Sequence, residues 1–228
     1  GQELGLQIEF TEINWDLKES LLNSEDVDLV WNGFTYTEDR DNGYYDEERG
    51  QQIGGLDFSK FYMENKQVAV VKAANASQYT SNASFDGKSG CAEASSAGSS
   101  VIKNLFKQTS NELPKQIDTF TAVEAGTFDY AVIDATMASV YIQAENAVYK
   151  DRLAVVEIDG VEKEYYAVGF ASGSNLVEVF NYAIAKIYAS GKAQQIAETY
   201  GLANVLYNGF SGVDITNYTL PTDGQFKD

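Results

Sequence analysis

The sequence contains no histidine, and this absence excludes several kinds of chemistry. Neither a Ser-His-Asp nor a Cys-His relay can be built, and zinc cannot be bound through imidazole. The chain also lacks the side chain whose unperturbed pKa lies closest to neutral pH. Catalysis by this chain would therefore depend on carboxylate, lysine or tyrosine groups.

Cysteine and long apolar runs are also scarce. Cys91 is the only cysteine, so it cannot form an intrachain disulfide and gives no evidence about the redox compartment. No apolar stretch approaches the roughly 18 residues expected of a membrane span. The beginning of the chain also lacks the basic and then apolar pattern of a signal peptide.

Basic residues are few. Lysine and arginine number 16 against 34 acidic residues, so the formal net charge is −18. Such a field repels phosphate backbones and anionic lipid headgroups, which argues against nucleic acids and membrane surfaces as partners. We therefore expect the partner to be a small molecule or another protein.

Short apolar runs alternate with helical stretches along the 228 residues, a length that suits one large domain or two lobes. This alternation predicts an α/β fold with mainly parallel sheets. Residues 1–5 have the pattern of a last helical turn ended by Gly5, so we expect polypeptide to precede Gly1. Strands are predicted at residues 6–10, 27–31, 67–72, 89–92, 130–133 and 153–158.

The clearest predicted helix covers residues 175–190, where apolar side chains recur at i, i+3 and i+4 and Gly191 follows. A second, shorter helix is predicted to end at Gly201. The composition changes at residues 73–100 and again at 156–173, and we interpret both places as crossings between two lobes. Lobe one is predicted to contain residues 1–72 and 168–228, and lobe two residues 73–167.

Three groups of polar residues directly follow predicted strands, where ligands of open α/β sheets bind. In the first group, Gly33 allows close backbone approach, Thr35 offers a hydroxyl, and Arg40 offers a planar fork suited to a carboxylate. A turn with a surface arginine explains the same residues equally well.

The other two groups also have two explanations each. Ser95 and Ser96 precede a predicted helix, whose free N–H groups suit an anion, although capping of that helix by a serine is the commoner role. Asp134 ends a strand, where it could receive an ammonium group or cap a helix equally well.

An ordered series of motifs resembles the bacterial extracellular solute-binding proteins of family 3, the receptors of ABC importers for polar amino acids. The motifs are Asn14-Trp15-Asp16, residues 33–40, Leu56-Asp57-Phe58-Ser59, residues 90–96, 126–130 and 166–173. The resemblance covers roughly residues 1–201. It implies a two-lobe, type II periplasmic-binding-protein-like fold, no cofactor, and an extracytoplasmic protein that is secreted or lipid-anchored once its signal peptide is removed.

Roles for individual residues also follow from this resemblance. The α-carboxylate of an amino acid would be held by Arg40, Thr35 and the amides of Ser95 and Ser96. The ammonium group would be held by Asp134 and the Gly33 carbonyl, and the ligand side chain would face Trp15, Phe34, Tyr36 and Glu93. Since these residues would come from both lobes, the ligand is expected to close the hinge before it is delivered to the membrane subunits of the importer.

Departures from the family pattern are expected to matter. Family members begin with a strand and a helix that are absent here, so we predict a first lobe that is incomplete, or completed by another segment or by a domain swap. Ala94 stands where the family usually has glycine. Residues 41–55 form an acidic insertion, and the tail 202–228 runs past the usual end of the family.

The sequence also contains features of other functions. Ser100 and Lys103 have the S-x-x-K spacing of a serine nucleophile, but the companion motifs are missing from the sequence. A dehydratase on the same fold, with Glu93 as general acid, is the enzyme alternative. A ligand-sensing module is the third possibility, and we expect a binding protein that performs no chemistry.

Overall fold

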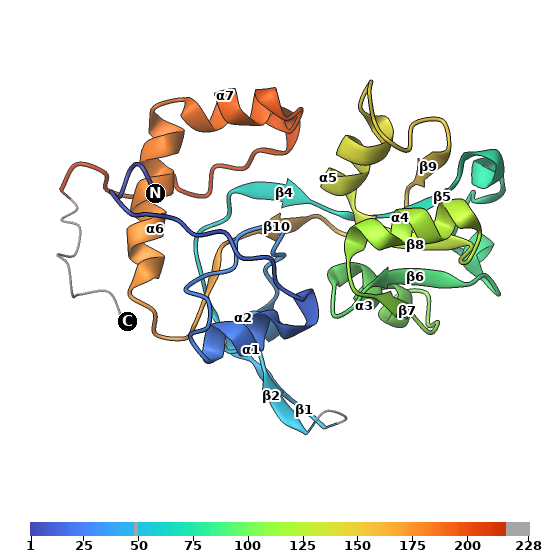
Figure 1. Cartoon of the computed structure of the whole chain (residues 1–228), viewed down its shortest axis with the longest axis horizontal. Helices are drawn as coiled ribbons and strands as arrows, with labels where there is room; N and C mark the ends of the chain where they lie inside the picture. Colours follow the sequence, from blue (N-terminus) through green and yellow to red (C-terminus); the bar gives the residue numbers. More distant parts are fainter. Residues whose placement is uncertain (48–49, 218–228) are drawn as a thin grey trace. The chain divides into compact units, whose positions relative to one another are not determined.

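A computed structural model of the chain describes residues 1–47 and 50–217. Its contacts divide the chain into two units. Unit 1 contains Gly1–Ile13, Leu17–Glu64 and the residues from Glu164 onward, and unit 2 contains Asn14–Asp16 and Asn65–Lys163. Each unit is described below by itself (Figure 1). Within the described residues, no helix combines the length and the apolar character needed to span a membrane.

Unit 2 is built on a five-stranded sheet in the order β7-β6-β8-β5-β9. The pairs β6-β7 and β6-β8 are parallel, whereas β5 pairs with both β8 and β9 in antiparallel fashion. The prediction of mainly parallel sheets is therefore wrong for β5 and β9, because an apolar run does not reveal the direction of a strand. The strands are β5 (Gln67–Lys72), β6 (Gly90–Glu93), β7 (Asn111–Leu113), β8 (Tyr130–Asp134) and β9 (Leu153–Val156).

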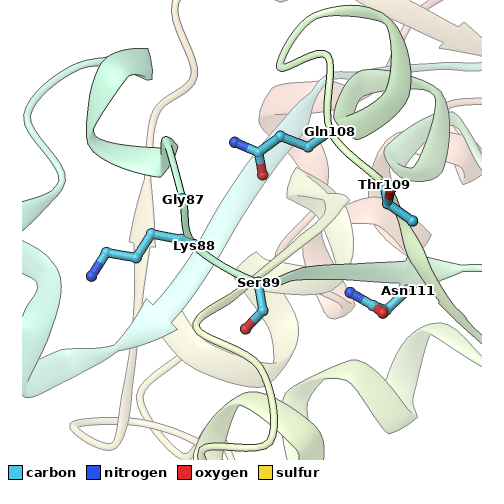
Figure 2. A pocket seen from close by; sticks show the side chains of 6 residues that line it. All are labelled: Gly87, Lys88, Ser89, Gln108, Thr109 and Asn111. Atoms are coloured by element: carbon cyan, nitrogen blue, oxygen red, sulfur yellow. The ribbon is translucent and has the colours of Figure 1, made fainter.

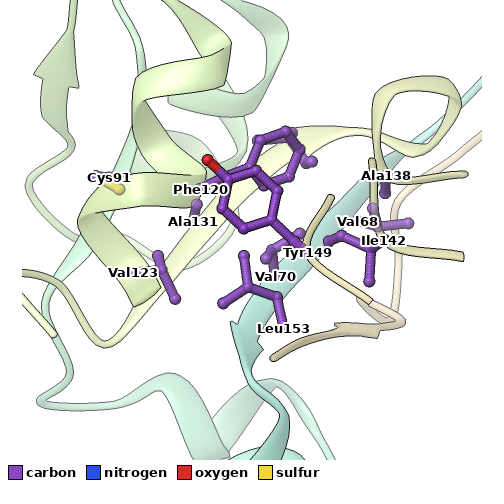
Figure 3. Packing of buried hydrophobic residues seen from close by; sticks show 11 residues of the cluster. Val68, Val70, Cys91, Phe120, Val123, Ala131, Ala138, Ile142, Tyr149 and Leu153 are labelled. Carbon is purple, nitrogen blue, oxygen red and sulfur yellow. The ribbon is translucent and has the colours of Figure 1, made fainter. Parts of the chain in front are cut away.

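Helices cover both faces of this sheet. Successive residues of β5 point to opposite faces, so Val70 joins a cluster with Phe120 of α4 (Figure 3), while Val71 joins a second cluster with Ile102 of α3. Cys91 is buried in the first cluster, and this burial raises the pKa of its thiol to about 12. The helical segments of unit 2 are η1 (Trp15–Leu17, which extends into unit 1), η2 (Ala73–Gln78), η3 (Asn82–Phe85), α3 (Ala97–Asn104), α4 (Gln116–Ala125), α5 (Ala135–Ala138) and η4 (Ser139–Gln143).

Unit 1 packs two helices and several short strand pairs around its own core. The predicted long helix is confirmed as α6, and Gly191, at φ +75°, ends it and leads into α7. Phe170, Phe180 and Ile184 form the centre of the core. The helical segments are α1 (Lys18–Asn23), α2 (Glu38–Asn42), α6 (Leu176–Ala189), α7 (Lys192–Thr199) and η5 (Ala203–Val205). The strand pairs are β1 (Tyr44–Asp46) with β2 (Gln51–Ile53), β3 (Asp57–Phe58) with β11 (Gly169–Phe170), and β4 (Met63–Asn65) with β10 (Glu164–Tyr166).

Other sequence predictions also differ from the structure. Residues 6–10 form no strand, and residues 27–31 contribute a single bridge, between Val30 and Gly169, because a strand also needs a hydrogen-bonding neighbour. The predicted lobe boundaries placed residues 67–72 in lobe one, but β5 lies in the sheet of unit 2. The tail prediction for 202–228 falls partly on residues 218–228, which lie outside the described residues.

Candidate functional site

Unit 1 holds the segment Gly33–Arg40 in an extended path that ends in the short helix α2. The Phe34 carbonyl accepts a hydrogen bond from the Ala167 N–H at 3.0 Å, and the Tyr36 N–H donates to the Tyr165 carbonyl at 2.9 Å. Gly33 has a φ of +59°, which favours glycine at this turn. The backbone beside Thr35 is therefore fixed before the chain reaches Arg40.

The Arg40 side chain is held against this segment by two contacts. Its Nη1 donates to the Thr35 carbonyl at 2.5 Å, and its guanidinium carbon lies 5.1 Å from the centre of the Phe34 ring. The Arg40 N–H donates to the Thr37 hydroxyl at 3.2 Å, so Thr37 caps α2. The structure thus fixes the guanidinium plane, which is the property needed for bidentate recognition of a carboxylate.

The Phe34 ring supports the Arg40 guanidinium. Its side chain has no exposed surface, and its ring contacts Phe58 edge-on at 5.2 Å. Although the sequence suggested that Phe34 faces a ligand, its ring belongs to the core of unit 1. We therefore interpret Phe34 as a support for Arg40, through a cation–π contact.

Aromatic side chains continue from this point across unit 1. The ring centres of Tyr36 and Phe61 lie 5.2 Å apart, and the Phe61 ring stacks on the Tyr165 ring with their centres 5.1 Å apart. The Tyr36 hydroxyl donates to Asp41 at 3.0 Å, and burial together with that carboxylate raises the pKa of Tyr36. Unit 1 therefore offers flat apolar surfaces next to a fixed cation.

In unit 2, the predicted serines lie where β6 passes into α3. The Ser96 hydroxyl accepts a hydrogen bond from the Ser99 N–H at 3.1 Å, so the predicted alternative of helix capping is confirmed for Ser96. Ser95 has a φ of +54°, an uncommon conformation for a residue with a side chain, and its hydroxyl donates to Asp16 at 2.5 Å. Gly98 lets α3 approach β8, since a Cβ there would lie 2.3 Å from the Val132 carbonyl oxygen.

Asp134, at the end of β8, accepts hydrogen bonds from three amide side chains. Its Oδ1 accepts from Asn65 at 2.6 Å and from Gln67 at 2.7 Å, and its Oδ2 accepts from Gln116 at 2.8 Å. Its side chain makes no capping bond to α5. Since a carboxylate has about four acceptor sites, these donors fix its plane and leave capacity for one more donor. None of these three amides is among the residues predicted from the sequence.

Glu93 and Trp15 are the remaining predicted residues of unit 2. Glu93 Oε1 accepts from the Gln116 N–H at 3.2 Å, so it lies at the N-terminus of α4, where a negative charge is stabilised. Trp15 is half-buried and begins the short helix η1. Gln116 therefore connects the two acids Glu93 and Asp134, and this structural role of Glu93 does not favour the dehydratase alternative.

The S-x-x-K residues of unit 2 do not form a nucleophilic pair. Lys103 donates to Glu112 at 2.7 Å, and the Ser100 hydroxyl donates to the Ser96 carbonyl at 3.4 Å. Among the described residues, no group of three or more acidic or cysteine side chains could hold a metal ion.

A surface hollow of about 390 Å³ in unit 2 contains none of the predicted residues (Figure 2). It lies at the amino ends of β6 and β7, next to Ser89 and Asn111, whereas the predicted residues follow the carboxyl ends of the parallel strands β6 and β8. The Gln108 amide in this hollow already donates to the Phe85 carbonyl and accepts from Tyr130. Opposite ends of the sheet therefore carry the hollow and the predicted residues.

Known proteins resemble this chain in both sequence and structure. The probable histidine-binding protein of Neisseria gonorrhoeae is 27% identical over 202 residues, which are 85% of this chain and 68% of that protein. An ABC uptake transporter substrate-binding protein from Streptococcus pneumoniae, solved with bound histidine, has a TM-score of 0.75 at 26% identity, over 91% of this chain and 81% of that one.

A third relative shows the same fold. The arginine-, lysine-, histidine-binding protein ArtJ from Geobacillus stearothermophilus has a TM-score of 0.76 at 24% identity, over 87% of this chain and 80% of that one. The model of the bacterial extracellular solute-binding proteins, family 3, matches residues 1–203, most of the sequence. The chain therefore belongs to the bacterial extracellular solute-binding proteins, family 3.

Proposed function

We propose that this chain captures an L-amino acid outside the cytoplasm and delivers it to an ABC importer. The observation that carries the proposal is the fixed guanidinium of Arg40, held by the Thr35 carbonyl and the Phe34 ring. A preorganised planar fork binds a carboxylate with little loss of entropy. The relatives described as histidine- or arginine-binding support an amino acid as the ligand.

Unit 2 supplies the groups for the rest of the zwitterion in this proposal. The N–H groups at the start of α3, beside Ser95 and Ser96, would also bind the carboxylate. Asp134 would accept the ammonium group at the acceptor site that its three amides leave, together with the Gly33 carbonyl from unit 1. Trp15 would contact the ligand side chain.

The ligand is proposed to carry a cationic or hydrogen-bonding side chain. A net charge of −18 raises the local concentration of cations and disfavours anions such as glutamate. The names of the relatives support this choice, because they mention arginine, lysine and histidine.

Calorimetry of the purified protein with L-arginine, L-lysine, L-histidine, L-glutamine, L-glutamate and L-leucine tests the proposed function. We expect at least one of the first four to bind, and the midpoint of thermal unfolding to rise with its concentration, because a ligand that binds only the folded state stabilises it. Binding of glutamate alone would contradict the proposed ligand class. An absence of heat and of thermal shift for the common amino acids would contradict the function itself.

Three further expectations belong to this proposal. The protein would be lipid-anchored or secreted, it would dock on the membrane subunits of the importer, and it would close on its ligand. Their support comes from the family and from the distribution of Arg40 and Asp134 over unit 1 and unit 2.

We also propose that unit 1 is completed by one β-strand from polypeptide outside residues 1–228. Within the described part of the chain, residues 7–11 form no backbone hydrogen bond, although Ile8 and Phe10 alternate with polar residues. Ile8 is 44% and Phe10 93% exposed, and the backbones of Leu29 and Trp31 are likewise unpaired within the described residues. Edges of this kind accept an added strand.

Residues 1–228 alone are therefore expected to self-associate as their concentration rises. Light scattering coupled to size exclusion should show this association, and replacement of Ile8 and Phe10 by aspartate should remove it. Val148→Asp is the control, because Val148 is also exposed, at 63%, but lies in unit 2. A monomer at every concentration, or equal effects of the two sets of changes, would contradict the proposed strand site.

A further inference from the structure

The hairpin β1-β2 follows α2 directly and projects from unit 1 (Figure 1), and the chain that returns from β2 then passes close to the backbone of α2 at Gly54. From this return we infer that Gly54 is a positioning residue for Arg40: it lets the returning chain pack against the backbone that carries the guanidinium. The inference rests on the proposed role of Arg40 in binding a carboxylate.

Gly54 lies too close to α2 for any side chain. A Cβ at Gly54 would lie 2.5 Å from the Asp39 carbonyl oxygen, 2.9 Å from the Arg40 carbonyl oxygen and 3.0 Å from the Arg40 Cα. All three are backbone atoms, so they cannot rotate away as a side chain would. A methyl group at this position therefore has to displace either the returning chain or α2.

The returning chain is also bonded to Arg40. Two residues after Gly54, the Leu56 N–H donates to the Arg40 carbonyl at 3.0 Å, and the Leu56 side chain is fully buried. At the end of α2, the Gly43 N–H donates to the Asp39 carbonyl at 2.8 Å. Displacement of the returning chain is resisted by the buried Leu56, so the short helix α2 is the part that moves.

Movement of α2 separates Arg40 from its supports. Its guanidinium is placed by the Thr35 carbonyl and the Phe34 ring, which lie on a different stretch of backbone from α2. A shift of about 1 Å can cost on the order of 100-fold where a group must be oriented. We therefore expect Gly54→Ala to weaken the binding of L-arginine, used as the probe ligand, by about 10- to 100-fold.

Gly55 provides a matched control. Gly54 and Gly55 have φ values of +73° and +72°, so alanine at either position has to adopt a positive φ, which residues with a side chain rarely do. A Cβ at Gly55, in contrast, meets no atom within 4 Å. Gly55→Ala should therefore lower the midpoint of thermal unfolding as a strained alanine does, and leave the affinity for L-arginine within about threefold of the parent protein.

A measurement that depends on the ligand carboxylate distinguishes displacement of Arg40 from a general loss of stability. The ratio of the affinities for L-arginine and L-argininamide measures recognition of the carboxylate, and it should fall in Gly54→Ala but not in Gly55→Ala. If alanine at position 54 prevents folding, the pair Gly54→Asn and Gly55→Asn repeats the comparison with less backbone strain, because asparagine tolerates positive φ.

The inference would be overturned if Gly54→Ala and Gly55→Ala had equal affinities for L-arginine and equal ratios of the affinities for L-arginine and L-argininamide. This holds even if both variants are less stable than the parent protein. Failure of the proposed function looks different, because the parent protein itself would then bind none of the common amino acids. Failure of the site assignment would show as an Arg40→Ala variant that binds L-arginine as the parent does. Loss of binding in Arg40→Ala together with equal behaviour of the two glycine variants would refute only the role of Gly54.

Discussion

Replacement of Arg40 by alanine is expected to abolish amino-acid binding while the protein remains folded. The guanidinium donates to the Thr35 carbonyl and lies over the Phe34 ring, and the proposal assigns the ligand carboxylate to the same group. Charge-assisted hydrogen bonds contribute about 1.5–3 kcal/mol each. Loss of a bidentate pair should therefore reduce the affinity at least about 100-fold in a calorimetric titration.

The stability of the Arg40→Ala variant should change much less than its affinity. The cation–π contact with Phe34 contributes about 0.5–2 kcal/mol, so we expect a shift of a few degrees in the midpoint of thermal unfolding. Arg40→Lys is the conservative control: it keeps the charge but not the planar fork, and it should restore only part of the affinity. Unchanged affinity in Arg40→Ala would refute the site assignment in unit 1.

Sheet strands of unit 2 could be predicted from the sequence because most are buried on both faces. The residues of β5 read as a continuous apolar run, and the two apolar clusters on opposite sides of the sheet bury both of its faces. The long helix α6 was predicted from its apolar period, and Val179, Phe180, Ala183 and Ile184 of that period are buried. Strand direction could not be predicted, because local sequence does not encode which neighbour a strand meets.

The strand predicted at residues 6–10 shows a second limit. Ile8 and Phe10 alternate with polar residues as in a half-buried strand, yet no described residue pairs with this segment. Alternation reports which face of a strand would be buried, whereas a strand also requires backbone partners. We therefore interpret the alternation at residues 6–10 as the pattern of a segment that pairs with the strand proposed to complete unit 1.

Parts of the candidate site could be predicted from the sequence because they lie at the ends of predicted strands. Ser96 and Asp134 lie at the ends of runs that the sequence predicts as strands and that form β6 and β8, and the ends of strands position ligand-binding groups. The amides around Asp134 were missed because Asn65 and Gln67 are distant from it in sequence. One signal was present: Gln67 begins an apolar run, and a polar side chain buried to 3% exposure needs a hydrogen-bonding partner.

Asp134→Asn is expected to produce the second large effect, a loss of about 100-fold in affinity for L-arginine. The substitution removes the negative charge that would face the ammonium group of the ligand. It also turns one acceptor into a donor among the amides of Asn65, Gln67 and Gln116, all of which donate to Asp134. A buried donor left unsatisfied costs about 1–3 kcal/mol, so the variant should also unfold at a lower temperature.

Two measurements separate the loss of ammonium binding from this loss of stability. 5-Guanidinopentanoic acid lacks the ammonium group of L-arginine, so its affinity should be weak and similar in the parent and in Asp134→Asn, as a double-mutant cycle requires for a direct pair. Asn65→Ala removes one donor to Asp134 but keeps the carboxylate. It should therefore lower stability and retain most of the discrimination between the two ligands. If Asp134→Asn weakens both ligands equally, Asp134 stabilises unit 2 without contacting the ammonium group, and the ammonium site has to be sought elsewhere.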